Sequence, residues 1–166
     1  MAKFEAGLPT DILKDVEFVE NNAVDIFKGM TKAGAEVAAQ NMKNRVSHAF
    51  KGSVAAQINA GLKVTKPYET KRREIVTGAR FYGYIPKKDG KPFKVKGYSY
   101  SQGVPRPLLV ALADEGKSVS SSMVRVFRNY WNGHKYPITI PAFANSAPIE
   151  AAMLKAQKEL SGGRLE

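Results

Sequence analysis

Apolar residues recur at helical spacing through the first fifty residues of the chain. Pro9 and Thr10 are typical of a helix start, with Thr10 as the N-cap, and Asn21-Asn22 is a candidate interruption. A longer amphipathic helix is predicted from about residue 22 to 50, and Gly52 is expected to stop it. Its apolar stripe follows steps of mostly three and four residues: Ile26, Met30, Ala33, Val37, Met42, Val46 and Phe50.

After Gly61 the pattern changes to that of strands. Residues 62–65 predict a short strand, and residues 74–85 (EIVTGARFYGYI) predict a longer, half-buried one because β-branched and aromatic residues alternate there. Asp89-Gly90 is a strong turn signal and predicts a hairpin whose returning arm is residues 93–100. In that arm, Phe93 and Val95 are expected on one face, and the other face takes Lys94, Lys96, Tyr98 and Tyr100.

The last third of the chain mixes clear and ambiguous segments. Residues 105–116 fit a helix that has proline in its first turn and stops at Gly116. Residues 117–122 predict a serine-rich loop, and 123–131 fit a strand or a helix equally. Residues 136–143 (YPITIPAF) are expected to be extended. A final helix is predicted from Ser146 to Leu160, closed by Gly162-Gly163, with a buried stripe of Ile149, Met153, Ala156 and Leu160.

These elements predict one α+β domain over residues 1–166. It has a long N-terminal amphipathic helix, a small, mainly antiparallel sheet and a C-terminal helix that packs on the sheet or on the long helix. Within the domain, residues 1–21 are expected to be an N-terminal arm or short helix. Residues 86–100 form a projecting basic hairpin and 161–166 a tail.

Composition narrows the chemistry. The 166 residues include no cysteine, which excludes disulfides and thiolate catalysis, and His48 and His134 are a poor basis for a metal site. The lack of cysteine also fits a reducing cytoplasm as the place of synthesis. The sequence has no apolar run long enough to predict a membrane span or a secretion signal.

The net charge of +11 is concentrated in the middle of the chain. Residues 41–100 carry fourteen basic and three acidic side chains, whereas residues 1–40 carry four basic and seven acidic ones. A band of this kind favours an anionic partner: nucleic acid, an acidic protein face or a phosphate-rich surface. A solvated lysine-rich face without a partner is the alternative.

Residues 111–118 (ALADEGKS) nearly match the nucleotide-binding phosphate loop. That loop needs a glycine at the position of Ala111, and Asp114 and Glu115 oppose phosphate. The better interpretation is a helix end closed by Gly116. Other nucleophile or metal motifs are absent from the sequence, so a hydrolase is the third hypothesis.

The order of segments resembles the tail-completion and head–tail joining proteins of long-tailed bacteriophages. Three features carry the resemblance. These are the long helix 22–50 followed by Gly52, the acid-glycine element in LADEGKS, and the Pro141-Ala142-Phe143 junction before the last helix. The usual Pro-x-x-Thr-Gly after the first helix is replaced by KGSVAAQ.

The resemblance implies a structural virion protein without catalysis or a cofactor. It implies a homo-oligomeric ring at the head–tail junction that contacts a head-connector and a tail-terminator protein, with DNA passing through the channel. The basic band supplies the candidate partner-binding residues, which are Lys71, Arg72, Arg73, Lys87, Lys88, Lys91, Lys94 and Lys96.

The runner-up is a nucleic-acid-binding protein that uses the 41–100 band. Aromatic residues interleave with the cations there and could stack on bases. They are Tyr68, Phe81, Tyr82, Tyr84, Tyr98 and Tyr100. Packing within the sheet is the simpler interpretation for Phe81 and Phe93.

Overall fold

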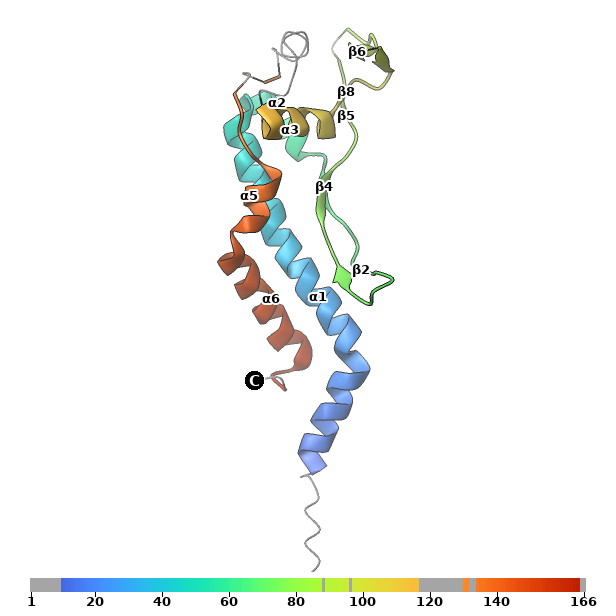
Figure 1. The fold of residues 1–166 in the computed structure, drawn as a ribbon, viewed down its shortest axis with the longest axis vertical. Helices are drawn as coiled ribbons and strands as arrows, with labels where there is room; N and C mark the ends of the chain where they lie inside the picture. Colours follow the sequence, from blue (N-terminus) through green and yellow to red (C-terminus); the bar gives the residue numbers. More distant parts are fainter. Residues whose placement is uncertain (1–9, 88, 96, 117–129, 132–133, 165–166) are drawn as a thin grey trace, which may run out of the picture.

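A single long helix forms the spine of the molecule. The computed structural model describes residues 10–87, 89–95, 97–116, 130–131 and 134–164, and α1 spans Thr10–Ala49. α6 (Ser146–Ser161) lies along one side of α1, and the strands and α3 lie on the other side (Figure 1). The N-terminal turns of α1 continue past the end of α6 (Figure 1). The mixed α+β class with two packed terminal helices is confirmed.

The remaining elements are short. The helices are α2 (Gly52–Asn59), α3 (Arg106–Glu115) and α5 (Thr139–Ala144). The strands are β1 (Leu62–Val64), β2 (Tyr68–Glu69), β3 (Ile75–Val76), β4 (Ala79–Phe81), β5 (Tyr84–Ile85), β6 (Phe93–Val95), β7 (Tyr98–Tyr100) and β8 (Val104–Pro105). Over the described residues they pair as β1–β4, β2–β3, β5–β8 and β6–β7, all antiparallel.

The predicted interruption of the first helix at Asn21-Asn22 is wrong. α1 is continuous, and the side-chain amide of Asn22 donates a hydrogen bond of 2.8 Å to the Phe18 carbonyl one turn earlier. Two asparagines each cost a helix only a fraction of a kcal/mol, roughly 0.7 at most. A long cooperative helix tolerates that cost.

The predicted stop at Gly52 is also misplaced. α1 ends at Ala49, and Lys51, in an extended conformation with φ −62° and ψ 145°, precedes a second helix that begins at Gly52. α2 was not predicted from the pattern of apolar residues. Its Val54, Ala55 and Ile58 are buried against the core.

The predicted strand 74–85 is divided into β3, β4 and β5. Gly78 and Gly83 stand between the segments, and Gly83 has φ 73°. A left-handed residue cannot continue a strand, so the chain changes direction at this point. β4 then pairs with β1, whereas β5 pairs with β8.

The hairpin is not centred on Asp89-Gly90. The register joins Val95 to Tyr98, so the chain turns between these two residues, and Gly97 there has φ 80°. Asp89-Gly90 forms a separate tight turn in which Gly90 N donates to the Lys87 carbonyl at 3.1 Å. Because the turn resets the alternation of faces, Tyr100 pairs with Phe93, and their ring centroids are 6.2 Å apart. Tyr98 pairs with Val95 in the same way, so the prediction that Tyr98 and Tyr100 share a face with Lys94 is wrong.

The core lies where α1, α2, β4 and α3 meet. Its largest fully buried side chains include Trp131, Met42, Ile58, Leu109 and Ile138. The stripe that α1 buries there is rich in alanine. Ala39 and Ala49 belong to this core together with the predicted Met42 and Val46, and Ala35 and Ala38 are buried farther toward the N-terminus of α1.

The C-terminal helix docks on α1 as predicted. A Cβ built on Gly34 would lie 3.0 Å from the Met153 side chain and 3.1 Å from Ile149, and one built on Gly29 would meet Leu160. The two glycines therefore form the surface on which α6 packs. Gly162, with φ 62°, ends α6, and Gly163 N donates to the Lys158 carbonyl at 3.1 Å.

Candidate interaction surfaces

The near-match to a phosphate loop lies at the end of a helix. Residues 111–115 form the last part of α3, and Gly116 caps it with φ 63° while its N–H donates to the Leu112 carbonyl. A phosphate loop requires a helix N-terminus, where N–H groups and the positive end of the helix dipole face the anion. A helix C-terminus presents carbonyls and the negative end instead. Lys117 and Ser118 lie outside the described residues.

The Asp114 carboxylate is engaged in a structural role. Its Oδ2 accepts a hydrogen bond of 2.7 Å from the Thr139 hydroxyl, and its Oδ1 accepts from the backbone N–H groups of Ile138 and Thr139. These groups form the start of α5, so the carboxylate caps that helix from a different element. The end of α3 and the start of α5 are thereby fixed to each other.

This cap explains why residues 136–143 are not extended throughout. Thr139–Ala144 is helical, and Pro141 occupies the first turn, where a missing N–H has no cost. The preceding segment runs along α1 and α3. Arg45 Nε donates to the Pro137 carbonyl at 2.6 Å, and Tyr136 N donates to the Ala113 carbonyl at 2.9 Å. The predicted extended conformation of 139–143 is therefore wrong.

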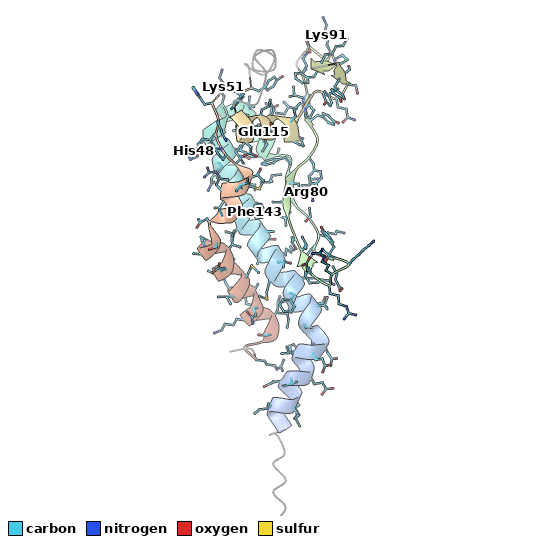
Figure 2. The ribbon with its side chains drawn as sticks, in the orientation of Figure 1. His48, Lys51, Arg80, Lys91, Glu115 and Phe143 are labelled. Atoms are coloured by element: carbon cyan, nitrogen blue, oxygen red, sulfur yellow. The ribbon has the colours of Figure 1, made fainter. Side chains whose placement is uncertain are left out.

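The structure divides the predicted basic band into two groups. Lys71, Arg72 and Arg73, here called the cationic turn, connect β2 to β3, and all three are exposed. Lys87, Lys91 and Lys94 lie around the Asp89-Gly90 turn and β6. Figure 1 shows β2 beside the middle of α1 and β6 at one end of the molecule, and Figure 2 shows Lys91 at that end with Arg80 between the two groups. Lys88 and Lys96 lie outside the described residues.

The cationic turn has a fixed backbone. Thr70 Oγ1 accepts hydrogen bonds from Arg72 N at 3.3 Å and from Glu74 N at 3.2 Å, while Arg73 N donates to the Thr70 carbonyl at 2.9 Å. Arg73 has φ 61°, a left-handed conformation that is uncommon outside glycine. The three cations are consequently presented on an ordered loop.

The second basic group is partly neutralised. Lys87 Nζ lies 3.1 Å from Asp89 Oδ2, and Lys91 N donates to Asp89 Oδ1 at 3.1 Å. The hydrogen bond from Lys87, with that from the Lys91 backbone, lowers the pKa of Asp89 below its ordinary value of 3.8. Phe93, only 5% exposed, anchors the hairpin to the core and leaves Lys94 on the outer face.

The aromatic residues of the band also separate into two kinds. Tyr68, Tyr82 and Tyr98 are exposed, so they are accessible to a partner. Phe81 is buried in the core, as the packing interpretation expected, and Tyr84 lies 6.4 Å from Tyr100 between ring centroids.

A surface that the sequence pattern did not reveal lies on the N-terminal part of α1. Ile12, Leu13, Val16, Val24 and Phe27 are all exposed large apolar residues. The spacing of these residues was visible in the sequence, but an apolar stripe on a helix is ordinarily core. The structure shows that Ile26 is buried while its neighbour Phe27 is 53% exposed.

Two open clefts lie along α1. One of about 420 Å³ lies between α1 and α6, and one of about 510 Å³ is lined by Ile12, Asp15, Val16, Val19, Glu20 and Arg164. An open cleft of about 290 Å³ between α1, β4 and α3 is lined mainly by apolar residues, and Asp114 in its lining already caps α5. Among the described residues, no three His, Asp or Glu side chains converge on a point that could hold a metal ion. None of the described helices is long and apolar enough to cross a membrane.

In comparisons with protein-family models, curated proteins and solved structures, nothing matches this chain.

Proposed function

We propose that this protein is a structural component of a tailed bacteriophage virion. In this role it forms a homo-oligomeric ring at the head–tail junction and joins the tail to the head connector. Its partners are copies of itself, a head-connector protein and a tail-terminator protein. The role involves no catalysis and no cofactor.

One observation carries the proposal. The two short elements on which the resemblance rests, Asp114-Glu115-Gly116 and Pro141-Ala142-Phe143, adjoin in space because the Asp114 carboxylate caps the helix that contains the second element. Elements that lie far apart in the sequence thus form one junction between α3 and α5. A shared structural junction supports the resemblance more strongly than two isolated short motifs do.

The distribution of charge is consistent with a protein that packs between other proteins. The acidic first forty residues and the basic middle of the chain give it two regions of opposite net charge. We infer that the lysines around the Asp89-Gly90 turn meet an acidic face of an adjoining ring. Lysines lining the channel would instead hold the DNA through counterion release and hinder its passage.

The test replaces Lys87, Lys88 and Lys91 with Glu in the phage genome. We expect the subunit to fold while micrographs show heads and tails that are not joined. A matched control replaces Lys43, Lys51 and Lys155 with Glu. These three lysines are exposed and lie outside the turn, so the control should give normally joined particles. Normally joined particles from the first variant contradict the proposed contact, and altered DNA retention with intact joining supports a channel lining.

A second candidate is nucleic-acid binding, which the exposed Tyr68 beside the cationic turn favours. Stacking on exposed aromatics and phosphate contacts from lysine and arginine are the usual combination for single strands. A gel shift of random DNA that weakens steeply with salt, and that is lost in the variant Arg72→Ala/Arg73→Ala, supports this candidate.

A further inference from the structure

One face of the N-terminal part of α1 is apolar and is not covered by the described part of the structure. Leu13, Val16, Val24 and Phe27 are 49%, 58%, 48% and 53% exposed. Glu20 lies between Val16 and Val24 in this series, so the five residues follow one another at steps of three, four, four and three. That spacing places them on one side of the helix. These five residues are called the arm face.

The next position along this side of the helix is Thr31, and it is covered. Thr31 Oγ1 lies 2.9 Å from Thr77 Oγ1, which follows β3. The arm face therefore continues, toward the N-terminus, the side of α1 on which the β2–β3 hairpin packs (Figure 1). At about 1.5 Å per residue, Leu13 lies about 27 Å from Thr31 along the helix axis, so the chain's own hairpin does not cover it.

The chemistry of the arm face defines what can cover it. Four large apolar side chains surround Glu20, and the exposed Glu17 flanks them. A partner must offer apolar or aromatic surface together with cations. The cationic turn of the same protein offers this combination, because Tyr68 on β2 is exposed beside Lys71, Arg72 and Arg73.

The order of the cationic turn favours its use in binding. The three hydrogen bonds to Thr70 hold its backbone before any partner arrives. Little conformational entropy is lost when such a loop is docked. The exposed Arg80 on β4 extends the positive surface.

We propose that the arm face of one copy docks on the cationic turn of the next copy. The proposal rests on the ring association of the proposed function and names the surfaces that make it. A symmetric pairing of two arm faces is disfavoured, because Glu17 and Glu20 of both copies would meet. A head-to-tail contact instead pairs acids with bases in every interface, and contacts of this kind close into rings.

The test uses two charge-reversal variants and their mixture. The arm variant is Glu17→Lys/Glu20→Lys, and the turn variant is Arg72→Glu/Arg73→Glu. Sedimentation measurements at low salt should show that the wild type associates. The association constant of each variant alone should be lower by a factor of about ten or more. An equimolar mixture should recover association, because lysine arms then face glutamate turns and glutamate arms face arginine turns.

A matched control tests whether any charge change on α1 has the same effect. Asp25→Lys/Glu36→Lys makes the same change on another side of the helix, at side chains that are 81% and 57% exposed. This control should associate like the wild type, and circular dichroism should show that all variants are folded. A monomeric wild type, variants that associate normally, or a mixture that stays dissociated would each overturn the inference.

The outcomes also distinguish the docking contact from nucleic-acid binding and from the proposed function in the virion. If the turn variant loses only DNA binding and keeps its association, the turn serves nucleic acid and the inference fails. If association follows the charge pattern but phage particles lacking the protein join heads to tails normally, the proposed function fails and the docking contact stands.

Discussion

The Thr139 hydroxyl donates a hydrogen bond of 2.7 Å to the Asp114 carboxylate, and this contact between residues 25 apart in the sequence joins two helices. A side chain at the end of one helix thus supplies the N-terminal cap of another. In most helices the cap comes from the residue that precedes the first turn. Here that residue is Ile138, which has no side-chain acceptor.

The first prediction concerns this cap. Asp114→Ala should lower the free energy of unfolding by about 1–2 kcal/mol, because it leaves the N–H groups at the start of α5 without an acceptor. Urea denaturation measures the change. Thr139→Val removes only the hydroxyl and should cost less, while Glu150→Ala at an exposed position of α6 is the control. Equal stability of Asp114→Ala and wild type contradicts the role of the cap.

The second prediction concerns the contact between α6 and α1. Met153→Asp should cost about 2–4 kcal/mol, since it places a charge against Gly34 in an apolar seam. The adjacent Leu154 is 62% exposed, so Leu154→Asp should leave stability nearly unchanged. Thermal melts of the two variants give a direct comparison, and similar melting temperatures would show that the seam is not closed in solution.

The third prediction is that the protein does not bind ATP or GTP. The end of α3 directs carbonyl groups and Asp114 to the place where a phosphate loop needs N–H donors. Isothermal titration calorimetry with magnesium should show no heat of binding. Micromolar binding that Lys117→Ala abolishes would contradict this prediction.

The fourth prediction concerns the pKa of Asp89. Because hydrogen bonds from Lys87 and the Lys91 backbone favour the charged form, this carboxyl should titrate below 3.8. Because this pKa is lowered in the folded state, the charged carboxylate contributes to the stability of the fold above the ordinary pKa. That contribution is lost as the pH falls through the lowered value. An NMR titration measures this, and Lys87→Met should raise the pKa toward 3.8. An unshifted value in wild type would show that the turn is open.

Helix ends marked by glycine were predictable from the sequence. α3 stops at Gly116 and α6 at Gly162, both with positive φ, and the predicted limits of these two helices are confirmed within a residue. Positive φ is a local requirement that a single residue reveals. The side of α6 that faces α1, with Ile149, Met153 and Leu160, was likewise predictable, because helical periodicity depends only on neighbouring turns. The predicted burial of Leu160 is wrong, since this side chain is 46% exposed.

Features that depend on distant residues were not predictable. α5 was expected to be extended because its cap is Asp114, and the strand 74–85 was expected to be continuous because its segments pair with different partners. The exposed cations of the cationic turn and of the Asp89-Gly90 turn were predictable from composition alone. The arm face does not, since Leu13 and Phe27 have the spacing of core residues and only the arrangement of other elements leaves them uncovered.

The packing of α6 against α1 also sets an order of events during synthesis. Asn41 in α1 donates a hydrogen bond to the Ala142 carbonyl, 101 residues later, and α6 follows that position. At about 5–20 residues per second, α1 leaves the ribosome roughly 5–20 s before the helix that shields it. During this interval the glycine-lined seam is open to chaperones and to neighbouring nascent chains. The face of α1 that packs against α6 is thus buried later than the face that packs against α2 and β4.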